Sequence, residues 1–384
     1  MLLREILGLE KIKKELTSSY SQNRIAHAQL FNGPKGSGKL AIALAYAQLI
    51  NCELYKNNDS CGTCSSCLKY LKLAHPDLHI IYPIIKKSST DKPISDDFIS
   101  LWRENILYNP YQSLDKWMES YKESFIEKVS NKKKEGVIYA HQIKELNRKL
   151  SLKIYEAKNR VVIIWMPEKM NIKAANKFLK LLEEPPKRTI LLLVSENKTS
   201  LLPTVLSRLQ IIDIPRYNIN ETISFFSDNK TSGFLSYCKR SNGDLGNLYN
   251  YNEDLENQDG FIERFSSLMR VCFKNNIVEI SSWVDQISAK TRENQIKILS
   301  YSISLIRECI IYNYSDKKIN NLSQQEENFI KKFSLYIHEE NSLQIISIFE
   351  SIIKNIQRNA NSKIILFDMS LRLVKLLKLK RKFV

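Results

Sequence analysis

The chain has 384 residues, a formal net charge of +17 and 43% hydrophobic residues. This length allows two or three domains, and the composition is that of an ordinary globular protein. The sequence contains no run of 18 apolar residues that would cross a membrane and no signal-peptide pattern, so we expect a cytoplasmic protein. The charge favours a polyanionic partner such as nucleic acid, but a lysine-rich surface that only aids solubility explains it equally well.

Strand and helix patterns alternate through the first two hundred residues. Periodicity predicts helices over 6–19, 39–50, 140–150 and 172–184, and strands over 28–32, 78–82, 160–165, 189–195 and 210–214. Strands that are apolar on both faces and alternate with helices predict a parallel sheet covered by helices. Residues 84–135 interrupt this rhythm, and their aromatic content predicts a helical insertion rather than a disordered linker. After Pro215 only helical patterns follow, among them 219–229, 231–240 and 259–274.

A glycine-rich loop, residues 33–40 (GPKGSGKL), lies between the predicted strand 28–32 and the predicted helix 39–50. Glycines at Gly33, Gly36 and Gly38 let backbone amides curl around phosphates, and Lys39 would meet the outer phosphates. In the full motif a Ser or Thr hydroxyl after the lysine binds magnesium, but Leu40 stands there. We predict a degenerate phosphate loop; a glycine-rich turn without a ligand is the alternative, and binding of ATP or ADP stays open.

The acid that usually accompanies such a loop is also missing. Phosphate-loop ATPases hold magnesium with an Asp at the end of a second buried strand. Here the strand 160–165 ends at Trp165 and continues into Met166, neither of which can bind magnesium. We expect Glu168, further along, not to bend back to the loop. Two magnesium contacts are therefore absent, which predicts a retained fold and a lost reaction.

Four cysteines form a closely spaced group: Cys52, Cys61, Cys64 and Cys67. Two overlapping Cys-x-x-Cys steps bring three thiolates to one ion, and Cys52 completes a tetrahedron, so we predict structural Zn²⁺. Disulfides and an iron–sulfur cluster are the alternatives. Because protein atoms fill all four positions, no site is left for catalysis, and we expect His75 and His79 to be ordinary loop and strand residues.

Two basic features remain. Arg208 precedes the last predicted strand; alone it is typical of a surface ion-pair partner, but ring-forming ATPases use such an arginine to complete a neighbour's site. Residues 366–384 predict a terminal helix packed in a bundle with a solvated basic end. DNA or a partner helix are the alternative ligands of that end.

Taken together, these motifs resemble the clamp-loader branch of the AAA+ proteins. The resemblance rests on the phosphate loop, the cysteine spacing, and residues 24–31 (RIAHAQLF), 174–186 (AANKFLKLLEEPP) and 201–208 (LLPTVLSR). Bacterial members of this branch are the gamma/tau and delta-prime subunits of DNA polymerase III. The resemblance covers about residues 1–250 without the insertion, and implies an AAA+ domain over 1–215 with a zinc module at 52–67, a helical lid over 216–255 and an oligomerising helical collar over 256–384.

The departures imply which type of subunit this is. Active gamma/tau subunits keep the residues that Leu40, Trp165 and Met166 replace, and Gly246 stands where the second sensor arginine is expected. The chain therefore resembles the ATPase-inactive delta-prime type, which joins gamma/tau and delta in a ring that places the sliding clamp on primed DNA.

By the same resemblance Arg208 would act in trans on a neighbour's ATP site, although Leu209 replaces the cysteine of the usual Ser-Arg-Cys. An active gamma/tau-type ATPase is the alternative. A zinc-containing nucleic-acid scaffold outside replication is a third interpretation.

Overall fold

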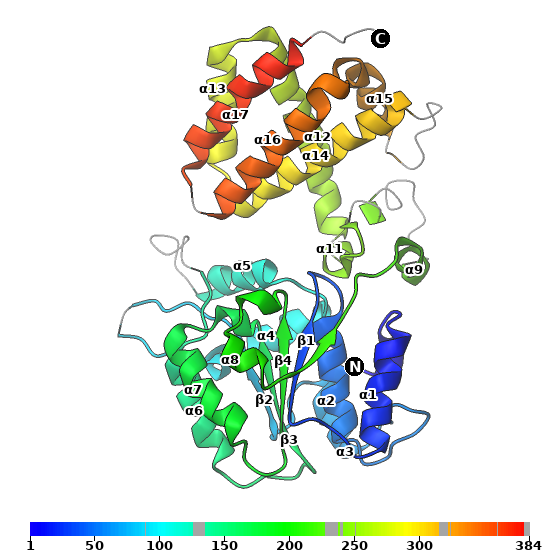
Figure 1. Cartoon of the computed structure of the whole chain (residues 1–384), viewed down its shortest axis with the longest axis vertical. Coiled ribbons are helices and arrows are strands. Elements are labelled where there is room, and N and C mark those ends of the chain that lie inside the picture. Colours follow the sequence, from blue (N-terminus) through cyan, green and yellow to red (C-terminus); the bar gives the residue numbers. More distant parts are fainter. Residues whose placement is uncertain are drawn as a thin grey trace. The chain divides into compact units, whose positions relative to one another are not determined.

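The computed structural model describes residues 1–88, 90–125, 135–226, 237–238, 241–249, 251–314, 322, 324–358 and 360–379. The chain divides into two compact units, one made of Met1–Ser227 and Ser241–Tyr249 and the other of Asp228–Arg240 and Asn250–Val384 (Figure 1). The boundaries expected at 215 and 255 stay a prediction. In the described residues, we find no helix with the length and apolar character that a membrane crossing requires.

The first unit contains a sheet of five parallel strands in the order β2-β3-β4-β1-β5. The strands are β1 (Ala28–Asn32), β2 (Leu78–Ile81), β3 (Arg160–Trp165), β4 (Thr189–Ser195) and β5 (Gln210–Asp213). All five expected strands are present, and the predicted parallel sheet covered by helices is confirmed. The central strands β3 and β4 are buried along their whole length, which explains their continuous apolar runs.

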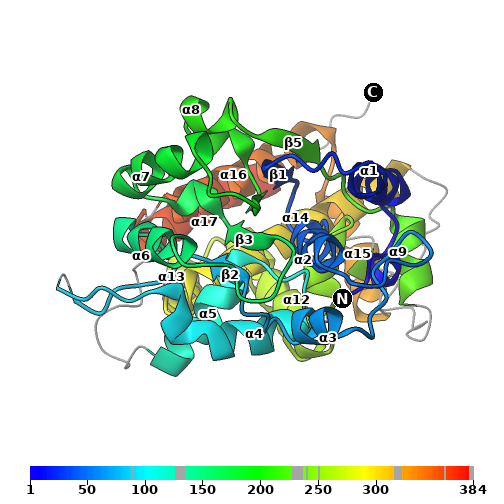
Figure 2. The same cartoon turned by 90° about the horizontal axis from the view of Figure 1, so that it is seen from below.

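Helices cover both faces of the sheet (Figure 2). On one face α6 (Ala140–Leu150), α7 (Ile172–Glu183) and α8 (Pro203–Leu206) form a core with inward residues such as Leu30, Ile164 and Leu191. On the other lies α2 (Lys39–Ile50), which is buried on all sides. Beside it are α1 (Glu10–Ser21) and α3 (Ser65–Leu71). The helix expected from residue 6 begins at Glu10 because Gly8 and Leu9 have φ values of 53° and 58°, which no α-helix accepts.

The insertion folds onto the end of β2. It contains the 3₁₀ turn η2 (Ser95–Phe98), α4 (Ile99–Tyr108) and α5 (Leu114–Phe125), while residues 89 and 126–134 lie outside the described part. Tyr82 stacks on Trp102 at 5.2 Å between ring centroids and meets Trp117 edge-on at 5.1 Å. The Trp117 indole donates to the Pro83 carbonyl at 2.9 Å. This aromatic core joins the insertion to the sheet.

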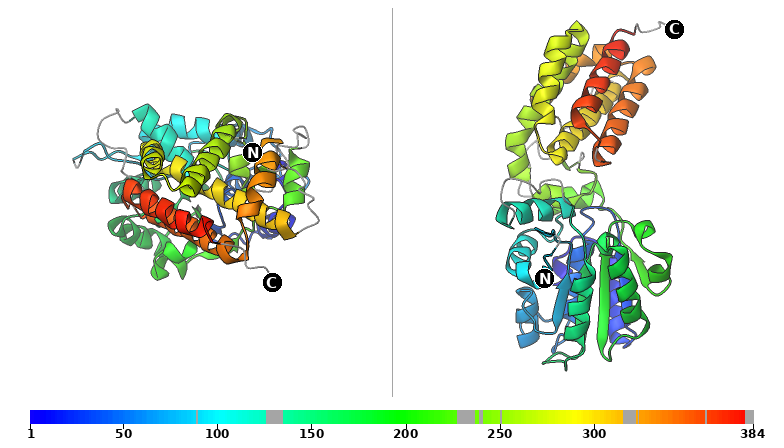
Figure 3. Two further views of the ribbon diagram at one scale, coloured as in Figure 1. Left: turned by 90° about the horizontal axis from the view of Figure 1, so that it is seen from above. Right: turned by 90° about the vertical axis from the view of Figure 1, so that its left-hand side faces the viewer.

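Two short helices follow the sheet in the same unit, α9 (Ile219–Phe225) and α11 (Leu245–Tyr249), and most of the helix expected over 231–240 lies outside the described residues. The second unit is helical (Figure 3). Its core gathers Phe265, Trp283, Ile306, Phe349 and Leu373. Its helices are α12 (Tyr251–Lys274), α13 (Ile277–Ser288), α14 (Arg292–Tyr314), α15 (Gln324–Phe333), α16 (Glu339–Gln357) and α17 (Ser362–Leu377).

Candidate phosphate loop and metal centre

The glycine-rich loop connects β1 to α2, as its sequence predicts. Gly36 and Gly38 have φ values of 69° and 79°, and Gly38 directly precedes the helix. These left-handed conformations are the reason for glycine at both positions. The backbone therefore has the curled shape of a phosphate loop at the N-terminus of a helix.

The loop is covered by another part of the same unit. The Asp244 carboxylate lies against Gly36, where an added Cβ would come within 2.6 Å of Asp244 Cγ, and the Tyr217 ring lies against Gly38 within 3.3 Å of such an atom. The Leu245 N–H donates to the Gly36 carbonyl at 3.2 Å. Asp244 is only 8% exposed. Asp244 and Tyr217 thus occupy the space beside Gly36 and Gly38.

Carboxylates surround the two loop lysines. Lys39 Nζ lies 3.4 Å from Glu196 Oε1, and Lys35 pairs with Asp115. Burial lowers the pKa of Lys39, although Glu196 and Asp244 act against it. Burial also opposes the charge of Lys35, but Asp115, with smaller effects of Glu196 and Asp244, outweighs it and raises the pKa. Much of the positive potential that would attract a polyphosphate is therefore balanced within the chain.

Glu168 lies beside Glu196, the partner of Lys39, and the expectation that it does not bend back to the loop stays a prediction. Its carboxylate accepts a hydrogen bond from the Glu196 N–H at 2.8 Å, and it acts electrostatically on Lys39. Burial raises the pKa of Glu168, so its charge is disfavoured there. Met166 takes a left-handed conformation (φ 57°) and starts a 3₁₀ turn over Pro167–Lys169. That turn brings the Glu168 side chain back toward the sheet edge.

The residues that replace the usual magnesium ligands are packed in the core. Leu40 is 3% exposed and belongs to the fully buried helix α2. Trp165 is 1% exposed and contacts Trp102 edge-on at 6.3 Å. Both side chains are apolar packing elements, and neither offers an oxygen to a metal.

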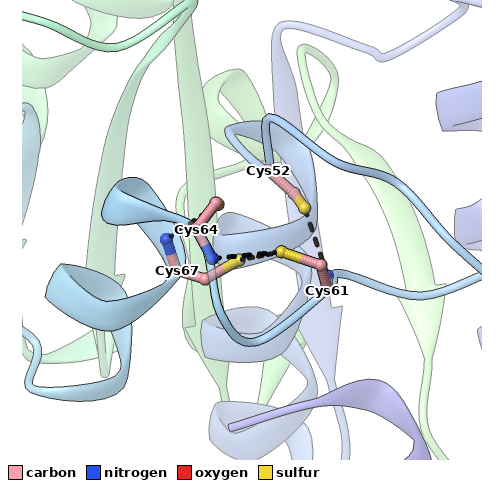
Figure 4. A group of neighbouring side chains, drawn as sticks. All are labelled: Cys52, Cys61, Cys64 and Cys67. Carbon is pink, nitrogen blue, oxygen red and sulfur yellow. Dashed lines mark hydrogen bonds between the residues drawn. The ribbon is translucent and has the colours of Figure 1, made fainter.

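The four cysteines converge at the end of α2 and the start of α3 (Figure 4). Their sulfur atoms all lie within 4.8 Å of one another, and Cys61 Sγ is 3.8 Å from Cys67 Sγ. Around a metal with Zn–S bonds of about 2.3 Å, tetrahedral sulfur atoms are about 3.8 Å apart. The predicted cluster of Cys52, Cys61, Cys64 and Cys67 can therefore hold a metal ion.

Backbone amides prepare these thiols to act as ligands. Cys61 Sγ accepts from the N–H of Thr63 at 3.4 Å and of Cys64 at 3.3 Å, and Cys52 Sγ accepts from the Cys61 N–H at 3.2 Å. Burial acts to raise the pKa of Cys61, but these amides outweigh it and lower the pKa to about 6. Burial raises the pKa of Cys67. A cation at the centre would favour the thiolate at every position.

Neither nearby histidine joins the cluster. His75 Nδ1 accepts from the Asp77 N–H at 3.1 Å, and its Nε2 lies 3.5 Å from a Glu156 carboxylate oxygen. Burial, with the positive charges of Lys149 and Arg160, lowers the pKa of His79 to about 4. In the described residues the metal-binding group consists of the four cysteines.

Arg208 lies at the surface. Its guanidinium pairs with Glu183 at 2.9 Å and donates to the Thr204 carbonyl at 2.9 Å, and its side chain is 39% exposed. Strand β5 pairs from Gln210 with Gln29 near the start of β1, whereas the phosphate loop follows the end of β1. The arginine and the loop thus belong to different ends of this strand pair.

Asp115, Glu196 and Asp244 are site residues that the sequence did not point to. Each is an ordinary acid in an unremarkable local pattern, although Asp244 lies two positions before Gly246, where the second sensor arginine is expected. Their role depends on contacts between distant segments, for which a single sequence carries no signal.

Comparison with known proteins finds similarity to subunits of DNA polymerase III. The family model described as DNA polymerase III, delta subunit, matches residues 8–218. DNA polymerase III subunit delta' of Bacillus subtilis is 29% identical over 53% of this chain and 46% of its own length, and that of Pseudomonas aeruginosa is 29% identical over 48% and 41%. DNA polymerase III subunit tau of Bacillus subtilis is 26% identical over 55% of this chain and 29% of its own length. The chain thus spans less than half the length of these curated relatives.

Proposed function

Because the chain belongs to the DNA polymerase III, delta subunit, family, whose model matches more than half of it, we propose that it is a delta-prime-type clamp-loader subunit without ATPase activity. It assembles with gamma/tau and delta subunits into a ring that loads the sliding clamp on primed DNA. Neighbouring subunits supply the hydrolysis. The lid over 216–255 and the collar over 256–384 complete its domains, and the collar serves oligomerisation.

The observation that carries this proposal is the closed phosphate loop. A triphosphate with magnesium needs positive potential, open space beside the glycines and oxygen ligands for the metal. Asp244 instead lies against Gly36, a carboxylate already pairs with each loop lysine, and Leu40 replaces the hydroxyl. A second anion in this space would meet like charge from Asp244 and Glu196.

Arg208 provides the catalytic contribution of this subunit. As a half-exposed guanidinium held by Glu183 and the Thr204 carbonyl, it is oriented and accessible to another chain. A positioned arginine stabilises the charge that develops on a transferred phosphate. In a ring it would complete a neighbour's ATP site.

Zinc is the metal that suits the cysteine cluster. Four sulfur ligands at tetrahedral spacing favour Zn²⁺ over hard cations, and the set leaves no open position for a substrate. Zn²⁺ would cross-link the end of α2 to α3. Its role is structural.

The direct test is ATP hydrolysis by the purified chain, with magnesium and primed DNA. We expect no turnover above that of the Lys39→Ala variant. Turnover that disappears in Lys39→Ala would overturn the proposal. Addition of gamma/tau and delta subunits should produce a ring that loads the clamp only when this chain is present.

The second candidate is an active ATPase of the gamma/tau type, and the position of Glu168 favours it. This buried carboxyl acts on Lys39 from the end of β3, near where an ATPase places its acid. If the chain hydrolyses ATP, Glu168→Gln should abolish that activity. Under our proposal, Glu168→Gln leaves the rate at background.

A further inference from the structure

We propose that the insertion holds the phosphate loop closed. Residues 109–115, which we call the brace, comprise the connection after α4 and the first two residues of α5. Residues 241–249, which we call the cover, include α11. The brace contacts both the cover and the loop, and so keeps Asp244 in the place beside Gly36. The inference rests on the proposed function in one respect, that the loop has no nucleotide to hold.

The first contact comes from a buried amide. Asn109 is 1% exposed, and its Nδ2 donates to the Gly246 carbonyl at 3.2 Å. Its Oδ1 accepts from the Tyr111 N–H at 3.0 Å, which fixes the amide orientation. The brace itself thus satisfies the Oδ1 end of this buried side chain, and the cover supplies the acceptor for its Nδ2 end.

Tyr111 contributes the second contact. Its ring stacks on Tyr249 at 5.5 Å and meets Tyr217 edge-on at 6.4 Å between centroids. The same ring lies within 3.1 Å of the position that a Cβ at Gly38 would take. One aromatic side chain therefore touches the cover, the start of the lid segment and the phosphate loop.

The backbone of Tyr111 sets how closely the cover approaches. A Cβ added to Gly246 would overlap with the Tyr111 carbonyl oxygen and come within 3.1 Å of its carbon. Gly246 is helical and carries no positive φ, so glycine is required here by proximity and not by backbone conformation. This close packing lets Leu245 reach the Gly36 carbonyl.

The third contact reaches the loop directly. Asp115, at the start of α5, pairs with Lys35, and the two side chains are 51% and 41% exposed. An exposed pair of this kind adds little stability. Its effect is to balance the charge of a loop lysine next to Asp244. The insertion thus supplies a carboxylate to the loop and holds in place the segment that supplies another.

Hydrogen exchange of the intact chain tests the brace. The reporter is the Leu245 amide, which the closed state protects. We expect Tyr111→Ala to speed its exchange roughly tenfold or more, because the aromatic contacts to the cover are lost. Tyr108→Ala is the matched control, since Tyr108 lies on the same insertion but is 65% exposed. It should leave the Leu245 rate unchanged.

A second variant approaches from the cover and leaves the insertion intact. Gly246→Ala adds one methyl group against the Tyr111 carbonyl and should also speed Leu245 exchange roughly tenfold. Amides of the buried strand β4 serve as the internal reference. A selective increase at Leu245 supports the brace. Equal rates in the wild type and both variants, or an increase shared with β4, overturns it. The exchange experiment does not measure ATP hydrolysis. ATPase activity found in a separate assay would therefore contradict the proposed function but would leave the test of the brace unaffected.

Discussion

Asp244 lies against Gly36, so that a side chain of any size at Gly36 would overlap with the carboxylate. An anion of the chain itself therefore occupies the space beside a loop whose backbone is shaped for phosphate. Burial raises the pKa of Asp244, while Lys35 and Lys39 act to lower it. Lys39, the lysine that a phosphate loop uses for nucleotide, thus interacts with a carboxylate of the protein.

Substitution of Gly36 should therefore lower the free energy of unfolding by more than backbone strain alone explains. Gly36 has a φ of 69°, and the Cβ of Gly36→Ala would lie against Asp244. Gly8 has a φ of 53°, and the Cβ of Gly8→Ala would meet only the flexible Glu221 side chain, at 3.6 Å. Both variants share the strain of the left-handed conformation. We expect Gly36→Ala to lower the free energy of unfolding by about 2 kcal/mol more than Gly8→Ala, as measured by urea denaturation. Equal losses would mean that Asp244 moves away freely.

Metal content tests the cysteine cluster. The purified chain should contain one zinc ion, and the double substitution Cys64→Ser/Cys67→Ser should remove it, because two ligands cannot retain a structural site. Mass spectrometry of the metal content measures this, with thermal unfolding as the second readout. Cys272→Ala is the control, since Cys272 is buried in the other unit. Its zinc content should equal that of the wild type, and zinc retained by the double variant would contradict the assignment.

Arg208 gives a prediction that separates stability from activity. Because the Arg208–Glu183 pair is exposed, Arg208→Ala should change the free energy of unfolding of the isolated chain by less than about 1 kcal/mol. In a reconstituted ring it should slow ATP hydrolysis at one neighbouring site by about a thousandfold. The substitution Arg208→Lys should not restore the rate, because lysine lacks the planar fork of the guanidinium.

Arg148→Ala provides the matched control for that experiment. Arg148 is also an exposed arginine paired with a glutamate, Glu145, at 2.6 Å. The ring that carries this variant should hydrolyse ATP at the wild-type rate. Equal rates for the Arg208 and Arg148 variants would identify Arg208 as an ordinary surface residue.

Asp77 predicts a pH dependence of stability. Its carboxylate accepts from the N–H groups of Tyr155, Glu156 and Ala157 at 2.8, 2.9 and 2.8 Å. Burial acts to raise the pKa of Asp77, but these donors outweigh it and hold the pKa below its usual 3.8. Because the folded pKa is depressed, the stabilisation is present above the unfolded pKa and is lost as the pH falls through the folded value.

The measurement is urea unfolding of Asp77→Asn at several pH values. At pH near 7 the variant should lose about 1–3 kcal/mol, and the difference from the wild type should narrow below a pH of about 4. Asp96→Asn is the control, because Asp96 pairs with Lys149 at the surface. If the difference in the free energy of unfolding between Asp77→Asn and the wild type does not change with pH, the effect of the substitution comes from packing and not from the charge.

The sheet and the four-cysteine cluster could be predicted from the amino-acid sequence. Strands β3 and β4 were predicted at their observed bounds because burial on both faces leaves uninterrupted apolar runs. The four cysteines were predicted as one site because two overlapping Cys-x-x-Cys steps bring three thiolates to one ion, and Cys52 at the end of the preceding helix can complete the set. Both predictions use local sequence patterns, which can be recognised without knowledge of distant contacts.

The state of the phosphate loop, in contrast, depends on tertiary contacts. Asp244, Asp115 and Glu196 reach it from three separate segments of the chain. The convergence of distant charges depends on how whole segments pack. Each charge contact contributes little free energy, and its partner is determined only once the packing has fixed the two backbones. The glycine-rich motif therefore identified where a phosphate could bind, and the tertiary structure shows that carboxylates of the chain lie at that place.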